Sequence, residues 1–300
     1  MLQDIHFNNI SVDTLSLPLL TEKKVDVDVV RLDKIHPLIS GNKWFKLRYY
    51  LEEAKSKHKK TIVTFGGAWS NHILAVAAAC RINNIKSIGI IRGEESVNPS
   101  PALIYAKEAG MQLVFISRED YGLKKIPEQL NTGDYYFINE GGYGIKGAEG
   151  AATILDYCEK EKYTHICCAA GTGTMMAGLI KGASLQNKII GISVLKNNTG
   201  LEEKVKSLLD NSSTTFQIFH DYHFGGYAKH KPELIAFMNT FYQQTKIPAD
   251  FVYTSKLFFA ITNLIAKNFF EPGCRLLLIH SGGLQGNASL SKGTLIFQDF

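Results

Sequence analysis

The sequence predicts an α/β protein made of two open, mostly parallel lobes, with a ligand site in the cleft between them. Short β-branched runs alternate with helical stretches from residue 61 to residue 117, and the alternation starts again near residue 134. The chain has 300 residues and 45% apolar content, which suffices for two modest cores. Because parallel strands end at a common edge of their sheet, the cleft beside those ends is the expected site.

The first series of elements predicts one lobe. Strands are expected at residues 61–67, 86–93 and 111–117, where β-branched and other apolar residues are concentrated. An alanine-rich helix is expected at 71–84, and a second helix at 101–110 begins with proline and ends with glycine. This order of strands and helices favours a parallel sheet covered by helices.

The second series predicts the other lobe. A strand and a glycine-rich break span 134–144, and an apolar strand, a glycine-rich turn and a helix share 164–180. The remaining elements are helices at 147–160, 233–244 and 255–269 and strands at 188–195 and 275–283. We therefore expect a larger domain of residues 1–46 and 141–300, with a smaller domain of residues 47–140 inserted within it.

Composition argues against several classes of protein. The net charge is +5, and the one dense basic run, residues 55–60, is typical of a solvated helix end rather than a nucleic-acid site. No apolar run approaches eighteen residues and the N-terminus lacks a signal-peptide pattern, so we expect no membrane contact and a cytoplasmic protein. An odd number of cysteines in mostly apolar surroundings indicates packed thiols in a reducing compartment. No metal-ligand spacing is present.

Lys43 stands where a helix begins, in the stretch SGNKWFKLRYYLEEA. Lys46, Leu47 and Tyr50 follow at helical spacing. A cation is disfavoured at a helix start, where the helix dipole is positive. A covalent bond to the Lys43 nitrogen would explain the placement, because an imine nitrogen differs from a free ammonium.

The strongest chemical signal is the turn AAGTGTMMAG, residues 169–178, between an apolar strand and a helix. Its backbone N–H groups and the helix dipole suit an anion. A dinucleotide motif requires glycine where Met176 stands, and a Walker A loop requires a Gly-Lys pair that is missing. A cup for a single phosphate remains, with a ligand-free tight turn as the alternative.

Two further turns end predicted strands. In FGGAWSNH, Ser70 is placed to cap the following helix, and Asn71 and His72 could meet a carboxylate. In HSGG, Ser281 brings a hydroxyl to a strand end, and His280 is typical of a core histidine. An imine-forming lysine, a single-phosphate cup and a carboxylate turn are together the parts that a pyridoxal 5′-phosphate enzyme requires.

The motifs SGNKWFK, GGAWSNH, GTGTMMAG, GGYAKH, DFVYTSK and HSGG occur in the order seen in fold-type-II pyridoxal-phosphate enzymes, which have the tryptophan synthase β-like fold. The chain most resembles the D-cysteine desulfhydrase and 1-aminocyclopropane-1-carboxylate deaminase branch of these enzymes, from about residue 31 to about residue 287. The resemblance implies a small amino-acid substrate and, since the family is commonly dimeric, a homodimer.

The resemblance also implies roles for individual residues. Lys43 would bind the cofactor covalently and act as the base, with Tyr227 and Tyr253 facing the substrate as candidate acids or as packing partners. Ser70 would join these catalytic residues and, with Asn71, His72 and Trp69, contact the substrate. The cofactor would further contact the residues that hold its phosphate and ring, namely Lys46, Asn71, Gly171, Thr172, Gly173, Thr174, Thr254 and Ser281.

Thr254 and Ser281 bear on the choice of reaction within this branch. The deaminases carry glutamate and leucine at the corresponding positions, and a carboxylate would keep the pyridine nitrogen of the cofactor protonated. Hydroxyls at both places favour α,β-elimination, as in D-cysteine desulfhydrase, which gives pyruvate, ammonia and sulfide. The deaminase, another type-II lyase or β-replacement enzyme, and a non-catalytic protein that binds a phosphometabolite are the alternatives.

Three features depart from this branch. Phe251 replaces a proline, Trp69 replaces a smaller glutamine, and residues 284–287 differ from the usual proline-containing run. The indole beside the carboxylate turn would narrow or reshape the pocket, so these changes bear on the choice of substrate rather than on the cofactor.

Overall fold

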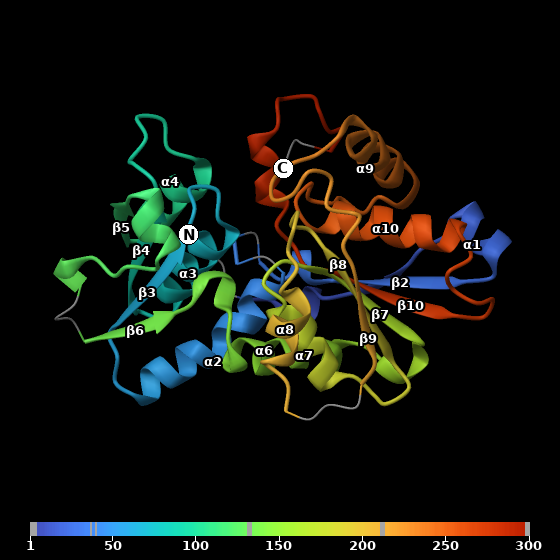
Figure 1. Ribbon diagram of the computed structural model, residues 1–300, viewed down its shortest axis with the longest axis horizontal. Coiled ribbons are helices and arrows are strands. Elements are labelled where there is room, and N and C mark those ends of the chain that lie inside the picture. Colours follow the sequence, from blue (N-terminus) through green and yellow to red (C-terminus); the bar gives the residue numbers. More distant parts are fainter. Residues whose placement is uncertain (1–4, 37, 40, 131–133, 211–213, 298–300) are drawn as a thin grey trace.

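The computed structural model describes residues 5–36, 38–39, 41–130, 134–210 and 214–297. Its larger sheet has the strand order β1-β2-β10-β7-β8-β9 (Figure 1). Only β1 runs antiparallel among the paired strands described. The strands are β1 (Val12–Thr14), β2 (Asp26–Arg31), β7 (His165–Ala170), β8 (Lys188–Ser193), β9 (Phe216–Phe219) and β10 (Arg275–His280).

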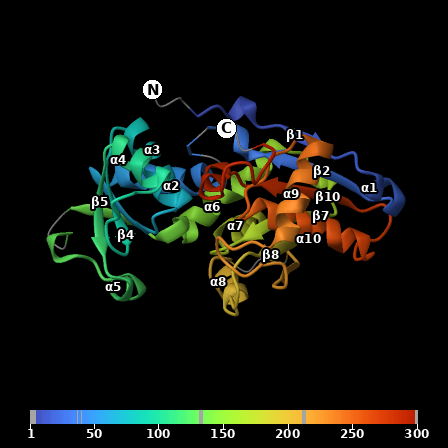
Figure 2. The same ribbon diagram turned by 90° about the horizontal axis from the view of Figure 1, so that it is seen from above.

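The smaller sheet has the order β5-β4-β3-β6 and is parallel throughout. Its strands are β3 (Thr61–Gly66), β4 (Lys86–Arg92), β5 (Met111–Ile116) and β6 (Tyr135–Ile138). In the view from above, the two sheets lie toward opposite ends of the molecule (Figure 2). The prediction of two mostly parallel α/β lobes is therefore confirmed.

Helices cover both sheets. In Figure 1, α9 and α10 lie on one side of the larger sheet and α6, α7 and α8 on the other. The helices are α1 (Pro18–Lys23), α2 (Asn42–Ser56), α3 (Asn71–Ile82), α4 (Pro101–Glu108), α5 (Arg118–Gly122), α6 (Ile145–Ala152), α7 (Thr174–Gly182), α8 (Leu201–Lys206), α9 (Pro232–Thr245) and α10 (Thr254–Ala266).

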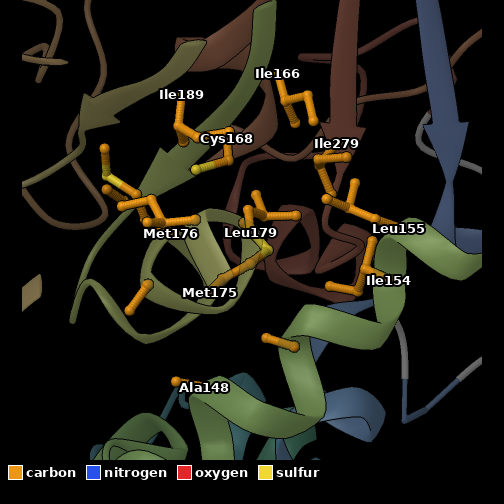
Figure 3. Close-up of a cluster of buried hydrophobic side chains, with 14 of the residues drawn as sticks. Ala148, Ile154, Leu155, Ile166, Cys168, Met175, Met176, Leu179, Ile189 and Ile279 are labelled. Atoms are coloured by element: carbon orange, nitrogen blue, oxygen red, sulfur yellow. The ribbon is translucent and has the colours of Figure 1, made fainter. Parts of the chain in front are cut away.

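The core explains why the central strands are apolar on both faces. Neighbouring residues of a strand point to opposite sides, so Cys167 packs in the cluster with α10, whereas Cys168 packs in the cluster with α7. Figure 3 shows Met175 and Leu179 of α7 in the cluster that contains Cys168, close to the strand residues Ile166 and Ile189. Each of the five cysteines is free, as expected of packed thiols.

Helix α2 connects the two lobes. Phe45 belongs to the core of the larger lobe, whereas Leu47 and Leu51 belong to that of the smaller lobe. The helix therefore crosses the predicted domain boundary after residue 46, and that boundary stays a prediction. A Cβ at Gly150 of α6 would lie 1.9 Å from the Phe45 carbonyl oxygen, so glycine permits backbone contact between α2 and α6.

Some predicted elements differ from the observed ones. The helix expected at 147–160 ends as an α-helix at Ala152 and continues as a 3₁₀ helix, Thr153–Tyr157. There the Thr153 hydroxyl donates to the Gly150 carbonyl, a local bond that competes with the regular helix. Sequence analysis also missed β1, β2, β9, α1, α5 and α8, which are short or, in β2, contain alternating acids.

Candidate active site

The two lobes border a cleft of about 1220 Å³. The turns after β3, β7 and β10 open into it, as predicted for the carboxyl ends of parallel strands. Twelve of the predicted site residues line this cleft, and they are Lys43, Lys46, Trp69, Ser70, Asn71, His72, Gly171, Thr172, Gly173, Tyr227, Tyr253 and Ser281. Thr174 and Thr254 do not line it.

Lys43 lies in the first turn of α2, which begins at Asn42 as the sequence predicted. Its Nζ is 3.1 Å from Asn42 Oδ1 and 5.8 Å from the centre of the Tyr253 ring. Burial lowers the pKa of Lys43 to about 8, against the opposing charge of Asp250. A larger fraction of Lys43 is therefore present as the neutral amine near neutral pH, and this is the form that makes imines and accepts protons.

Gly41 brings Lys43 against the HSGG turn. Its φ is +66°, and a Cβ there would lie 1.8 Å from the Ser281 carbonyl oxygen. The Asn42 backbone N–H donates to that same oxygen over 3.2 Å. Ser40, which opens the predicted motif, lies outside the described residues.

Lys46 lies one helical turn beyond Lys43 and is 5% exposed. Its Nζ donates to the Gly141 carbonyl over 3.4 Å, and burial followed by repulsion from Lys43 lowers its pKa. In the part of the chain that the structure describes, neither lysine forms a salt bridge. A half-buried amine at Lys43 and a buried amine at Lys46, neither with a contacting carboxylate among the described residues, fit an added anion such as phosphate.

The glycine–threonine turn follows β7 and leads into α7. Gly173 precedes the first residue of α7 with φ +83°, and a Cβ there would lie 2.8 Å from the Val205 side chain. Thr172 lines the cleft, and its hydroxyl is 3.0 Å from that of the fully buried Thr174. The turn therefore offers a cup beside the Lys43–Lys46 face, with Thr174 supporting it from beneath.

Ser70 caps α3, as predicted. Its Oγ accepts hydrogen bonds from the backbone N–H groups of His72 and Ile73, at 3.2 and 3.3 Å. Asn71 begins the helix and lines the cleft. Trp69 also borders the cleft and is 45% exposed, so its indole can meet a ligand.

His72 is a neutral ring that donates through Nε2 and carries its lone pair on Nδ1. The Thr64 hydroxyl donates to the Ile138 carbonyl over 2.7 Å, so it accepts from His72 Nε2, which is 2.8 Å away. Nδ1 is buried and has no hydrogen-bond partner in the part of the chain that the structure describes, and burial, followed by Lys43 and Lys46, lowers the pKa of His72 to about 3. Its ring thus presents a lone pair rather than a donor, which disfavours the predicted contact with a substrate carboxylate.

Tyr227 and Tyr253 both line the cleft, and their ring centres are 6.3 Å apart. Burial raises the pKa of both hydroxyls, and a hydrogen bond between them raises that of Tyr253 further. Both side chains are therefore protonated near neutral pH, as a proton donor must be.

Asp250 holds Tyr253 and Thr254 in place, a role that sequence analysis missed. The buried carboxylate accepts from the backbone N–H groups of Val252, Tyr253 and Thr254 at 2.8–2.9 Å. The Thr254 hydroxyl donates to Asp250 Oδ1 and accepts from the Asp250 N–H, both at 2.7 Å. Since Thr254 is engaged below the cleft, Ser281 is the hydroxyl of the pair that lines it.

The described residues contain no group of three His, Cys, Asp or Glu side chains placed to hold a metal ion. None of the helices within the described ranges combines the length and the apolar character needed to cross a membrane.

Comparison with known proteins agrees with these observations. Residues 14–282 match the family described as pyridoxal-phosphate dependent enzyme. A Thermotoga maritima protein with the provisional name 1-aminocyclopropane-1-carboxylate deaminase is 31% identical, over 92% of this chain and 95% of that protein. The Arabidopsis thaliana bifunctional D-cysteine desulfhydrase/1-aminocyclopropane-1-carboxylate deaminase, mitochondrial, is 29% identical, over 83% of this chain and 70% of that protein. The crystal structure of an ACC deaminase homologue is similar with a TM-score of 0.80 and 25% identity, over 95% and 92% of the two chains.

Proposed function

Because this chain belongs to the pyridoxal-phosphate dependent enzymes, and within them to the deaminase and desulfhydrase branch, we propose that it catalyses α,β-elimination from a small amino acid. The expected reaction is that of a D-cysteine desulfhydrase, with pyruvate, ammonia and sulfide as products. One observation carries this choice. Of the acids in the described part of the chain, Glu140 alone lines the cleft, and it pairs with Lys124. The position that takes glutamate in the deaminases therefore carries the Thr254 hydroxyl in this chain, and the position that takes leucine carries the Ser281 hydroxyl.

The described residues fit the cofactor. Lys43 supplies the amine for its aldehyde, while the turn Gly171–Thr172–Gly173 and Lys46 supply donors and positive charge for its phosphate. Asn71, which lines the cleft, would bond the phenolic oxygen. The resemblance assigns the ring nitrogen to Thr254, but Thr254 does not line the cleft, so we assign this contact to Ser281. When bound, pyridoxal phosphate supplies an electron-withdrawing ring that acidifies the Cα proton of an amino acid.

Lys43 is the proposed base. Once its amine is free, burial favours the neutral form, which takes the Cα proton. Ser70 and Asn71 would hold the substrate carboxylate at the start of α3, where the helix dipole favours an anion. Either Tyr227 or Tyr253, both protonated, would supply a proton to the departing thiolate, while the other packs beside it.

Ring-opening deamination of 1-aminocyclopropane-1-carboxylate is the second candidate, and the names of the similar proteins favour it. Its product would be a four-carbon 2-oxo acid, whereas elimination from cysteine gives three-carbon pyruvate. The predicted domain boundaries and the homodimer also stand as proposals.

A side-by-side assay separates the candidates. Purified protein with pyridoxal phosphate is offered D-cysteine, L-cysteine, D-serine and 1-aminocyclopropane-1-carboxylate, and the 2-oxo acids are identified by mass. Pyruvate and sulfide from a cysteine support elimination, and the four-carbon acid alone would reject it. Borohydride should fix the cofactor to Lys43, so a Lys43→Ala protein that still retains reducible cofactor would contradict the assignment.

A further inference from the structure

The smaller lobe presents a cationic wall to the cleft, consisting of Arg92, Arg118, Tyr121 and Lys124. Arg92 ends β4, and Arg118 begins α5 just after β5. Because β4 and β5 are parallel, their carboxyl ends bring both guanidinium groups to one edge of the sheet. This wall is distinct from Lys43 and Lys46, which enter the cleft from α2.

The charges of this wall are only partly balanced. Glu140 is the one lining carboxylate in the described chain, and its Oε2 is 2.5 Å from Lys124 Nζ. Arg92 and Arg118 have no carboxylate oxygen within 4.0 Å among the described residues. Two guanidinium groups without acids in a cleft favour an anionic ligand, which arginine binds through paired hydrogen bonds.

Tyr121 gives this wall a buried donor. It is 6% exposed and lines the cleft, and among the described residues its hydroxyl has no hydrogen-bond partner of normal geometry, although the Glu140 carboxylate is a neighbour. The ring is held by Phe65, with ring centres 5.8 Å apart, and by Lys124, whose Nζ is 4.0 Å from the ring centre. Burial, followed by Glu140, raises its pKa, so the hydroxyl keeps its proton and can donate to a ligand.

The wall and the proposed reaction centre border the same cleft, which Lys43, Tyr227 and Tyr253 also line. The cleft of about 1220 Å³ exceeds the roughly 300–1000 Å³ of common small-molecule sites, which leaves room beyond a cofactor and the backbone of an amino acid.

We propose that the cationic wall is a substrate subsite for an anionic group carried by the β-substituent of the amino acid. This inference rests on the proposed elimination and names its substrate class: β-substituted alanines whose leaving group carries a carboxylate or phosphate. In the reaction, the Cα–H bond breaks and Lys43 takes the proton. The Cβ–S or Cβ–O bond breaks, and the leaving group departs with the electron pair, is protonated by a tyrosine hydroxyl and stays bound by the wall until release. Water then converts the three-carbon remainder to pyruvate and ammonia.

The test compares two substrates that differ only in charge. S-carboxymethylcysteine carries a carboxylate, and S-carbamoylmethylcysteine carries a neutral amide of nearly the same shape; both enantiomers of each are assayed for pyruvate. We expect kcat/KM to be about tenfold or more higher for the acid. Arg92→Gln combined with Arg118→Gln should bring the acid-to-amide ratio close to one, and Tyr121→Phe should lower it without changing charge. O-phosphoserine tests whether phosphate is accepted as well as carboxylate.

The control is Lys204→Gln, which removes a positive charge that lines the same cleft from α8. Lys204→Gln should leave the acid-to-amide ratio of kcat/KM unchanged. If this ratio falls equally in Lys204→Gln and in the double arginine variant, the preference comes from general electrostatic attraction to the cleft rather than from a subsite. Equal kcat/KM for acid and amide in the unaltered protein, with cysteine still eliminated, would overturn the subsite alone. If no amino acid is eliminated, titration of the cofactor absorbance separates the two claims: tighter binding of the acid supports the subsite and rejects elimination, and equal or absent binding rejects both.

Discussion

Lys256 Nζ lies 2.7 Å from the carbonyl oxygen of Gly226, the residue before Tyr227. The same nitrogen donates to the His223 carbonyl over 2.8 Å, and the side chain is fully buried in α10. A buried ammonium thus anchors the loop that carries one of the proposed proton donors. Phe224 and Ala228 in this loop have φ of +50°, a backbone strain that such an anchor helps to maintain.

Lys256→Met should therefore weaken both the fold and the reaction. The change leaves buried carbonyl oxygens without donors, and we expect a loss of roughly 2–4 kcal/mol in the free energy of unfolding. Urea denaturation measures this loss. In folded protein, kcat should fall more than KM rises, because Tyr227 loses its position. Lys267→Met, at the exposed end of the same helix, is the matched control and should change neither. Unchanged kinetics in folded Lys256→Met would reject the positioning role.

The pH profile of elimination should have an acid limb near the pKa of Lys43. Burial lowers this pKa to about 8, so the amine becomes a competent base as pH rises through that value and is protonated below it. Asp250 raises the Lys43 pKa, and Asp250→Asn should consequently move the limb to lower pH. Rates measured between pH 5 and 10 check both statements. A profile that stays flat into the acid range would point to another base.

His72 should make the protein sensitive to acid. Its folded pKa of about 3 lies below the ordinary 6.5, so the unfolded chain binds an extra proton between these values. The contribution of neutral His72 to the free energy of unfolding should be fully present above pH 6.5 and should be lost as the pH falls toward 3. We expect His72→Gln to flatten this part of the dependence of urea midpoints on pH. His58→Gln, at an exposed position, provides the comparison. Equal slopes in the two variants would mean that His72 is protonated in the folded state.

Gly41→Ala should displace Lys43. A Cβ at this position would overlap the Ser281 carbonyl oxygen at 1.8 Å, and φ of +66° is strained for alanine. We expect a loss of roughly 2–4 kcal/mol in stability and weaker retention of pyridoxal phosphate, read from its absorbance after dialysis. Gly200→Ala is the control because a Cβ there has no neighbour within 4 Å and its φ is −99°. Full retention in Gly41→Ala would show that the close approach is dispensable.

Sequence alone determined the features that depend on local order. The alternation of β-branched runs and helical stretches predicted two mostly parallel lobes, and strand ends marked by glycine predicted the cleft; both are confirmed. The family and its cofactor were also predicted from motifs, and the family match confirms them. Ser70 capping α3 followed from its place before Asn71. These predictions succeed because periodicity, capping and turn chemistry act between residues close in the chain.

Tertiary structure decided which of those groups are charged and where they point. Only the fold brings the Asp250 carboxylate against Thr254 and withdraws that hydroxyl from the cleft, and only burial beside two lysines keeps the His72 ring neutral. Arg92 and Tyr121 are 29 residues apart in the chain, yet they meet on one wall because parallel strands end at a common edge. Desolvation and Coulomb forces depend on distance in space, and residue order within a motif does not contain that distance.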